Sequence, residues 1–347
     1  MTTHQSFPDG VKSTSWEVQT VSAWFRVGSM GDITIFANRL RKNVRHWDKW
    51  ARRQGVTCYR AYDRDVPEYP VAIDVYQERV HLQEYETRWE TDPDTVRRWR
   101  EEMIATVAQV LRCPRAMIAV KRRQRQRGTA QYEKLNDKGE SFIVMENGHR
   151  FEVNLDNYLD TGLFLDHRNT RRMVQERVEG ARFLNLFAYT GAFTVYAAAG
   201  GAACSTTVDM SNTYQDWARR NFLLNGMDLS QHKLVRADVF RYLSSARHSG
   251  PQYDLIVMDP PSFSNSKKMQ GVLDIQRDHV ALVDDAMALL ATGGELFFST
   301  NRRGLRLSDG LHDRYLVHEI SRQTVPDDFR NKNIHRCWIL QHPGECN

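Results

Sequence analysis

The second half of the chain alternates short apolar runs with helical stretches, and this alternation limits its possible folds more than any other feature. The runs, rich in β-branched and aromatic residues, are Phe183–Phe187, Ser205–Val208, Lys233–Arg236, Leu255–Met258 and Leu296–Ser299. Stretches with helical periodicity, such as Thr213–Leu224 and Gln276–Leu290, lie between them. Such a pattern predicts an α/β fold in which helices cover both faces of a parallel sheet.

The length and composition set the overall organisation. A chain of 347 residues is longer than one hydrophobic core usually serves, so we expect two domains. The predicted division is a loosely structured lead-in at 1–30, a smaller basic α/β domain at 31–155 and the alternating domain at 156–347. With 41% apolar and 26% charged residues, the composition is that of a soluble globular protein.

Several classes of protein are disfavoured. The longest nearly apolar run, Phe193–Cys204, is too short for a membrane span, and the N-terminus lacks a secretory signal pattern. The five cysteines are scattered without the spacing of a disulfide framework or a metal site. We therefore expect no metal, no membrane partner and a cytoplasmic location.

The residues that follow the predicted strands are candidates for ligand binding, because open parallel sheets bind ligands at the carboxyl ends of their strands. Asn185, Phe187 and Tyr189 lead from the first run to Gly191, a single glycine where a dinucleotide site needs three. NAD and FAD are therefore disfavoured. Asp209 follows the second run, where a carboxylate can accept both ribose hydroxyls of a nucleoside.

A nucleoside ligand without a diphosphate fits both observations, and the other strand ends point to S-adenosylmethionine. Asp238 follows the third run, where its carboxylate can accept a hydrogen bond from the amino group of an adenine. Asp259-Pro260-Pro261 follows the fourth run, beside the expected position of the reactive methyl group. Asp209 could instead cap a helix near Ser211, and the prolines could form a simple turn, but their joint order favours a cofactor site. The predicted cofactor contacts are Asn185, Phe187, Tyr189, Gly191, Asp209, Met210, Ser211, Asp238 and Asp259.

Basic residues gather in the first half of the chain. Residues 1–150 contain 26 Lys and Arg against 20 Asp and Glu, whereas the remaining residues contain 22 against 23. The cations concentrate on a predicted helix, Phe36–Gln54, and in the segment Lys121–Arg127. The residues expected to bind RNA through its phosphates are Arg39, Arg41, Lys42, Arg45, Lys49, Lys121, Arg122, Arg123, Arg125 and Arg127. A solvated face is the alternative for both segments, and a membrane-surface helix is a further alternative for the first.

Short β-rich runs follow the basic helix. The predicted strands are Cys58–Tyr62, Val71–Tyr76, Val80–Tyr85, Ala116–Lys121 and Phe142–Met145, with a helix at Asp94–Leu111. These elements predict a small sheet with helices, and the surplus of cations suggests that this domain binds RNA.

Longer motifs carry a resemblance to a known family. They are Phe36 through Leu40, Pro67-Glu68-Tyr69, Tyr158 through Arg168, Asn185 through Gly191, Asp209-Met210-Ser211, Asp259 through Lys267 and Gln276 through His279. With these motifs, the chain from about Phe36 to Trp338 resembles the C-terminal methyltransferase half of the bifunctional bacterial 23S ribosomal RNA guanine methyltransferases. The Tyr158–Arg168 run is the most specific of them.

The resemblance implies a class I, Rossmann-like domain that uses S-adenosylmethionine to methylate guanine N7 in 23S ribosomal RNA, in the helix 74 region of domain V. It also implies that Asp166, His167 and Arg168 help to close the cofactor pocket. The substrate would be 23S ribosomal RNA or a large-subunit precursor. The other methyltransferase half of that family is not found in this sequence. Two alternatives stay open: a separate methyltransferase chain acts on the same region as a partner, or this chain is a stand-alone relative.

The strand ends also bear on the reaction. Cytosine C5 methylation needs a nucleophilic cysteine after the fourth or fifth strand, and neither end has one. Guanine N7 carries an exposed lone pair, so its methylation needs no general base. We expect the substrate side to be formed by Asp259, Pro260, Phe263 and Asn301 as catalytic residues, with Arg302 and Arg303 neutralising phosphate. Methylation of an exocyclic amine and a non-catalytic role in ribosome assembly stay open as alternatives.

Overall fold

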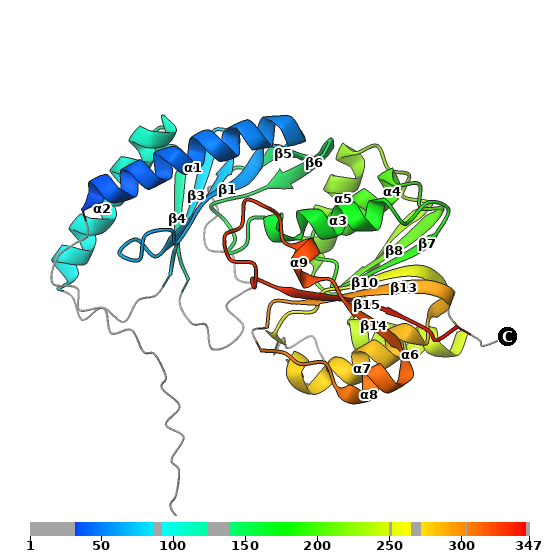
Figure 1. Ribbon diagram of the computed structural model, residues 1–347. Coiled ribbons are helices and arrows are strands. Elements are labelled where there is room, and N and C mark those ends of the chain that lie inside the picture. Colours follow the sequence, from blue (N-terminus) through cyan, green and yellow to red (C-terminus); the bar gives the residue numbers. More distant parts are fainter. Residues whose placement is uncertain are drawn as a thin grey trace, which may run out of the picture.

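The computed structural model describes residues 32–85, 92–123, 139–249, 252–264, 272–302 and 304–344. It contains a smaller N-terminal unit and a larger α/β unit (Figure 1). The predicted lead-in at 1–30 and the RNA-binding candidates Arg125, Arg127 and Arg303 lie outside the described residues. No helix in the described ranges combines the length and apolarity needed to cross a membrane.

The N-terminal unit is a four-stranded sheet covered on one face by two helices. The chain order is α1 (Ile33–Gln54), β1 (Cys58–Asp63), β2 (Val71–Tyr76), β3 (Arg79–Tyr85), α2 (Pro93–Leu111) and β4 (Ile118–Arg123). Strands β1, β2 and β3 are antiparallel neighbours, and β4 pairs parallel with β3 because α2 forms the crossover between them. Both predicted helices and four of the five predicted strands are present in this unit, with small shifts at the ends, but the strand predicted at Phe142–Met145 does not join this sheet.

The ends of α1 follow local chemistry. It begins earlier than predicted because the Asp32 carboxylate accepts the Thr34 N–H at 2.8 Å and caps the first turn. It ends at Gly55, whose φ of 65° is the left-handed conformation that glycine adopts at low cost. On the inner face, the Phe36 ring stacks on Tyr69 and meets the edge of Tyr62, which fixes the helix against the sheet.

A separate hairpin, β5 (Phe142–Glu146) and β6 (His149–Val153), connects the two units. Only its first strand is predicted by the sequence pattern. It packs on the larger unit: Phe151 stacks on Tyr196, and the Trp217 indole donates to the Glu152 carbonyl at 2.9 Å. The expected domain boundary at residue 155 falls directly after this hairpin.

The larger unit is a seven-stranded sheet with the order β14-β15-β13-β10-β7-β8-β9. Its strands are β7 (Arg182–Leu186), β8 (Cys204–Asp209), β9 (His232–Arg236), β10 (Tyr253–Met258), β13 (Leu290–Thr300), β14 (Leu316–Glu319) and β15 (Arg336–Gln341). The five predicted strands pair in parallel, and β14 and β15 add an antiparallel edge. A short hairpin, β11 (Phe263–Ser264) and β12 (Leu273–Asp274), lies outside this sheet.

Helices lie on both faces of this sheet, as predicted (Figure 1). They are α3 (Arg168–Gln175), α4 (Ala192–Ala199), α5 (Asn212–Leu224), α6 (Val239–Ser249), α7 (Ile275–Met287), α8 (Asp309–Arg314) and α9 (Ser321–Thr324). The helix predicted for Gln276–Leu290 ends at Met287, because β13 begins at Leu290. The α/β fold with helices around a mainly parallel sheet is thus confirmed.

Candidate active site and cofactor pocket

A cavity of about 330 Å³ opens at the carboxyl ends of β7, β8, β9 and β10. Its lining includes ten of the predicted cofactor residues: Asp166, His167, Asn185, Phe187, Tyr189, Asp209, Met210, Ser211, Asp238 and Asp259. Two predicted substrate-side residues, Pro260 and Asn301, line it as well. Residues that are distant in the sequence therefore converge where parallel strands end. We call this cavity the cofactor pocket.

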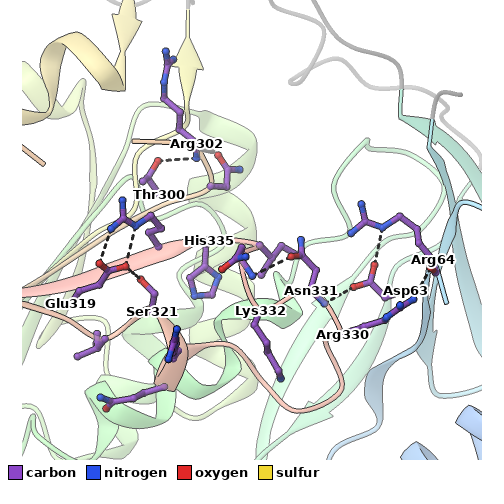
Figure 2. Close-up of a pocket in the computed structure, with 18 residues that line it drawn as sticks. Asp63, Arg64, Thr300, Arg302, Glu319, Ser321, Arg330, Asn331, Lys332 and His335 are labelled. Atoms are coloured by element: carbon purple, nitrogen blue, oxygen red, sulfur yellow. Dashed lines mark hydrogen bonds and ion pairs between the residues drawn. The ribbon is translucent and has the colours of Figure 1, made fainter. Parts of the chain in front are cut away.

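A larger and more open hollow of about 1170 Å³ adjoins this pocket (Figure 2). It is lined by residues after β13 and from the segment 319–336, and by Asp63 and Arg64 at the end of β1. Asn301 lines both hollows. The second hollow, here called the basic groove, therefore runs from the N-terminal unit to the edge of the cofactor pocket.

The turn between β7 and α4 supplies one wall of the cofactor pocket. Phe187 and Tyr189 adopt φ values of 55° and 53°, which are uncommon for residues with side chains and indicate a tightly held turn. Gly191 was predicted to contact the cofactor, but it does not line the cavity. Its φ is 74°, and a Cβ there would lie 2.7 Å from the Phe222 ring, so the glycine is needed for close packing of α4 against α5.

Asp209 is the acceptor at the end of β8. Its carboxylate accepts the Tyr189 N–H at 3.0 Å and the Ser211 N–H at 2.9 Å. Burial raises the pKa of Asp209 to about 6, while the backbone hydrogen bonds partly oppose this shift. The alternative in which Asp209 caps α5 is wrong, because the cap is Ser211, whose Oγ accepts the Tyr214 N–H at 3.4 Å.

The next two positions are also held by hydrogen bonds. Asp238 accepts the Phe240 N–H at 2.8 Å, which fixes its carboxylate at the beginning of α6 beside the Phe240 ring that lines the pocket. Asn185 is buried, and its side chain donates to Thr194 Oγ1 at 3.0 Å. Asp238 thus offers a fixed acceptor to a ligand, whereas Asn185 is committed in part to the packing of α4.

Asp259 follows β10 and is held from two sides. The Ser299 hydroxyl donates to its Oδ1 at 2.6 Å, and His167 Nε2 lies 3.4 Å from its Oδ2. Nearby, the Ser262 hydroxyl donates to Asn301 Oδ1 at 2.5 Å, which ties the loop after β10 to the loop after β13. The rigid Asp-Pro-Pro loop predicted from the sequence is therefore anchored to the neighbouring strand.

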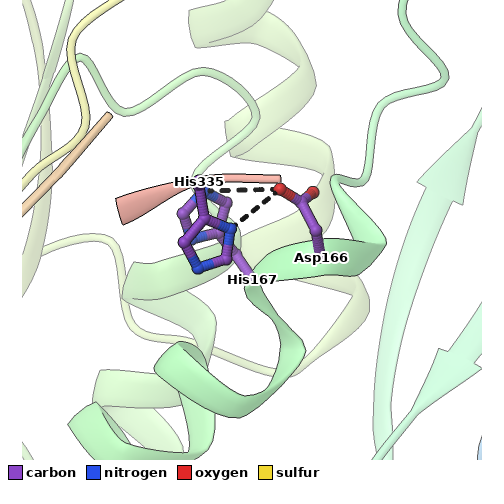
Figure 3. A group of neighbouring side chains, drawn as sticks. All are labelled: Asp166, His167 and His335. Atoms are coloured by element: carbon purple, nitrogen blue, oxygen red, sulfur yellow. Dashed lines mark hydrogen bonds and ion pairs between the residues drawn. The ribbon is translucent and has the colours of Figure 1, made fainter. Parts of the chain in front are cut away.

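Asp166, His167 and His335 form a cluster at the wall of the pocket (Figure 3). His335 Nδ1 lies 3.1 Å from Asp166 Oδ2, and the two imidazole rings are stacked with centroids 4.3 Å apart and planes 10° from parallel. Burial opposes ionisation of Asp166, but the neighbouring imidazoles and the His335 hydrogen bond lower its pKa. Burial also lowers the pKa of His167.

These three side chains could be taken for metal ligands, but their geometry argues against it. An imidazole binds a metal through a lone pair in the plane of its ring. Stacked, nearly parallel rings cannot both direct that lone pair to one ion. The cluster is better described as a polar support that links α3, which follows His167, to the segment before β15.

Two predicted site residues lie elsewhere. Arg168, expected to close the cofactor pocket, is buried behind it and does not line it. Its guanidinium binds Glu146 at 3.0 Å, Asp328 at 2.9 Å and the Cys58 carbonyl at 2.7 Å, so it joins β5, β1 and the segment before β15. Phe263 is 47% exposed on β11 and is not part of the pocket lining.

The basic residues predicted to bind RNA differ in their surroundings. The predicted cations of α1, namely Arg39, Arg41, Lys42, Arg45 and Lys49, are all exposed. Lys121 is buried, and its ammonium donates to the carbonyls of Tyr158 at 2.6 Å and Leu159 at 3.0 Å. Burial lowers the pKa of Lys121 to about 8. Its prediction as an RNA contact is wrong, because the side chain holds β4 to the loop before the pocket.

The other cations near the site are exposed in part. Arg122 is exposed and lies 3.7 Å from Glu84. Arg302 pairs with Asp274 at 3.0 Å beside the basic groove. For Arg123, only the backbone of β4 is described.

Sequence reasoning missed much of the apolar lining of the pocket. The additional rings are Phe164, Phe193, Tyr214 and Phe240. Phe164 lies in the Tyr158–Arg168 run, whose specificity was a usable signal. The other rings sit in helices, where an aromatic residue that lines a pocket has the same sequence pattern as one that packs in the core.

The pocket fits S-adenosylmethionine by the chemistry of its donor and acceptor groups. Carboxylates after β8, β9 and β10 can accept hydroxyl and amino hydrogens, and the aromatic rings offer faces to an adenine. The raised pKa of Asp209 shows that backbone hydrogen bonds offset only part of the cost of burying this carboxylate, so it can accept further hydrogen bonds from a ligand. When bound, this cofactor supplies an electrophilic methyl group.

Comparisons with known proteins agree with this fit. Residues 71–331 match the family described as S-adenosylmethionine-dependent methyltransferase. The chain is 58% identical over 321 residues to ribosomal RNA large subunit methyltransferase K of Neisseria meningitidis serogroup B, covering 92% of this chain and 91% of that protein. It is 53% identical over 308 residues to methyltransferase K/L of Stutzerimonas stutzeri, covering 88% of this chain but only 42% of that protein.

A solved structure gives the same result. The fold matches the crystal structure of SMU.776, a methyltransferase complexed with SAH, with a TM-score of 0.70 and 26% identity over 89% of this chain and 81% of that one. The cofactor of this chain is S-adenosylmethionine. The chain belongs to the S-adenosylmethionine-dependent methyltransferases, in the group that includes ribosomal RNA large subunit methyltransferases K and K/L.

Proposed function

We propose that this protein methylates N7 of a guanine in 23S ribosomal RNA, using S-adenosylmethionine. The names of its relatives, which refer to the large ribosomal subunit RNA, support the substrate class. The chain spans about 42% of the length of the K/L relative, and a partner methyltransferase chain that acts on the same RNA region is part of the proposal. The substrate is 23S ribosomal RNA itself or a large-subunit precursor, in a cytoplasmic setting.

The observation that carries the N7 assignment is the setting of Asp259. The Ser299 hydroxyl donates to the carboxylate at 2.6 Å, and His167 Nε2 lies 3.4 Å from its other oxygen, so the carboxylate has a neighbour on each side at the pocket. Methylation of N7 makes the guanine ring cationic, and a fixed carboxylate stabilises that growing charge in the transition state. No proton has to leave, so no free base is required. His167 is a positioning residue here, because it acts through Asp259.

The target base has to leave its helix to reach this site. The major groove of A-form RNA is too narrow for side chains, so an N7 atom is accessible only in a base that is unpaired or splayed out. In this proposal Pro260 and Asn301 border the base. Phe263 is exposed and does not line the pocket, so its predicted stacking on the base requires the base to extend beyond the pocket lining. The exposed cations of α1 and Arg122, with Arg302 nearer the pocket, contribute to RNA binding in this proposal.

The test is chemical. RNA modified by the protein with labelled S-adenosylmethionine is treated with borohydride and then aniline, which cleaves at N7-methylated guanosine but not at nucleosides methylated on an amine or a carbon. We expect cleavage at one guanine in 23S RNA. Label that resists cleavage would reject the N7 assignment and favour the exocyclic amine, with Asp259 and the Pro260 carbonyl as hydrogen acceptors.

Asp259→Asn separates the same two reactions. The variant loses the charge but keeps a hydrogen-bond acceptor, so an N7 enzyme is expected to retain a measurable fraction of its rate. An enzyme that depends on Asp259 as a base should lose activity almost completely, because removing a general base typically costs about 10²–10⁴-fold. Nucleoside mass spectrometry of the product identifies the methylated atom in each case.

A further inference from the structure

The basic groove combines exposed cations with a path to the cofactor pocket. Six cationic side chains line it against two carboxylates, Asp63 and Glu319. Both carboxylates are already paired within the protein: Glu319 binds Arg336 at 2.6 Å, and Asp63 lies 3.2 Å from the Arg64 guanidinium. The groove is therefore a surface whose negative charges are largely neutralised.

Within the described part of the chain, three cations of the groove form no ion pair within 4 Å of a carboxylate: Arg322, Arg330 and Lys332. All three are exposed. Hydrogen bonding to Arg336 lowers the pKa of the Glu319 carboxyl, and Arg322 lies near enough to that carboxyl to contribute. Arg330 donates to the Arg64 carbonyl at 2.9 Å, and Lys332 donates to the Pro326 carbonyl at 2.8 Å. These bonds orient the two side chains, which Figure 2 shows, without neutralising their charge. Such charges favour an anionic partner.

The segment that carries Arg330 and Lys332 is anchored below the surface. Asp328 binds Arg168 at 2.9 Å and accepts the Arg60 N–H at 2.9 Å, and the Phe329 ring lies 4.3 Å beneath the Arg60 guanidinium. The cations therefore stand on a fixed support, which lowers the ordering cost of binding a charged partner.

The groove also offers amides and leads to the reaction site. Asn331 and Asn333 line it, and Asn301 stands at its junction with the cofactor pocket. Phosphates attract cations, whereas base edges match amide groups that donate and accept hydrogen bonds. An RNA strand fits this arrangement when its phosphates contact the cations and its bases face the amide groups of the groove. A base at Asn301, where the groove meets the cofactor pocket, would reach the methyl group.

We propose that the basic groove binds the single-stranded RNA segment next to the target guanine, with Arg322, Arg330 and Lys332 on its phosphates. This inference rests on the proposed function and deepens it. A single strand is required because its bases are exposed to the amides, and because RNA recognition that reads sequence targets unpaired segments. The strand would pass from the N-terminal unit toward Asn301, where one base turns into the pocket.

The test replaces the three cations together by glutamine (Arg322→Gln, Arg330→Gln, Lys332→Gln), which keeps hydrogen-bond donors on the side chains. The binding of a fluorescent single-stranded RNA oligonucleotide is measured by anisotropy between 50 and 200 mM salt. The salt slope is the change in the logarithm of the binding constant with the logarithm of the salt concentration, and each phosphate contact to a single strand contributes about 0.7 to its magnitude. Loss of three contacts should reduce that magnitude by about two. Between 50 and 200 mM salt, the affinity of the wild type should therefore fall about 20-fold more than the affinity of the variant. A duplex of equal length should respond less to the substitutions.

The matched control removes three exposed cations at the opposite edge of the sheet (Arg219→Gln, Lys233→Gln, Arg236→Gln). This variant should keep the wild-type slope. Binding of S-adenosylhomocysteine, followed by calorimetry, should be unchanged in both variants and shows that each is folded. An unchanged slope in the groove variant, or polyglutamate competing as well as RNA, would overturn the proposal.

The two proposals fail separately. If the groove variant loses RNA affinity but the wild-type product resists aniline cleavage, the groove stands and the N7 assignment falls. If the product is N7-methylguanosine and the groove variant binds RNA like the wild type, the function stands and the groove assignment falls.

Discussion

The cofactor pocket and the basic groove share Asn301 but are built in different ways. The pocket is a small cavity in which carboxylates and aromatic rings follow successive strands of the parallel sheet. The groove is wide and open, and its cations come from the segment 319–336 and from the end of β1. One gathers acceptors for a small cationic cofactor, and the other gathers cations for a polyanion.

The difference shows how one fold serves two ligands of opposite charge. The parallel strands fix the pocket, since the end of each strand delivers one acceptor. The groove depends instead on contacts between the two units, above all on Arg168, which holds Glu146 and Asp328 behind both hollows. The pocket is therefore expected to tolerate changes in the groove, and both should respond to a loss of their shared support.

The largest effect is expected for Arg168→Met. Both carboxylates paired with Arg168 are fully buried, so removing the guanidinium leaves uncompensated charge and should lower the free energy of unfolding by about 3–5 kcal/mol. Urea denaturation measures this change. The control is Arg172→Met on the same helix, an exposed residue near Glu176, for which less than about 0.5 kcal/mol is expected. Equal stability of the two variants would show that Arg168 is not the shared support.

The next effect should be confined to the pocket. Asp209→Ala removes the acceptor for two ribose hydroxyls, and charge-assisted hydrogen bonds of this kind contribute about 1.5–3 kcal/mol, or about 10- to 150-fold in cofactor affinity. Calorimetry measures the loss, and RNA binding in the groove should be retained. Asp216→Ala, an exposed substitution on α5, serves as the control. Cofactor affinity equal to that of the parent would refute the role of Asp209.

The pH dependence of cofactor binding should also separate the two hollows. Because burial raises the pKa of Asp209 to about 6, the carboxylate is ionised above that pH and becomes protonated below it. A protonated group is a weaker acceptor, so cofactor affinity should fall by up to about tenfold per pH unit below 6. Asp209→Asn should bind more weakly at pH 7.5 and show a flatter profile. A wild-type profile that is flat between pH 7.5 and 5 would contradict this assignment.

The smallest effect concerns the exposed cations of α1. Substituting Arg39, Arg41 and Arg45 by glutamine should flatten the salt dependence of single-stranded RNA binding by less than about 0.7 per residue, and so by less than the groove variant does, with no change in cofactor affinity. Anisotropy measurements beside the groove variant compare the two surfaces directly. If the α1 variant loses more affinity for a single strand than the groove variant, the main RNA surface is on the N-terminal unit instead.

Much of the fold could be predicted from local pattern. The five parallel strands and the helix α1 follow from periodicity and residue type, and the carboxylates of Asp209, Asp238 and Asp259 lie where the strand ends predict. The antiparallel strands β14 and β15 were missed, because they follow the last predicted parallel strand and lie outside the regular alternation of strands and helices that identifies the rest. The second hairpin strand β6 was missed for a similar reason.

The errors share a physical cause. Lys121 was expected to bind RNA because it begins a dense run of cations, and Arg168 was expected at the cofactor pocket because the family resemblance implies it. Both are instead buried and bound to carbonyls or carboxylates of other elements. Gly191 was assigned to the cofactor, whereas its missing side chain makes room for Phe222. In each case the relevant property of the residue, a positive charge or a missing side chain, was recognised, but the groups that surround it could not be known from the sequence.

Local patterns in the sequence were enough to predict the strands, the helices between them and the carboxylates after three of the strands, because these features depend on residues close together in the chain. Tertiary structure alone decided which distant groups meet. Arg168 pairs with Asp328 across 160 residues, and Asp166 with His335 across 169. Whether a charged side chain binds a ligand or supports the fold depends on its burial and its partners, and both are set by such long-range contacts.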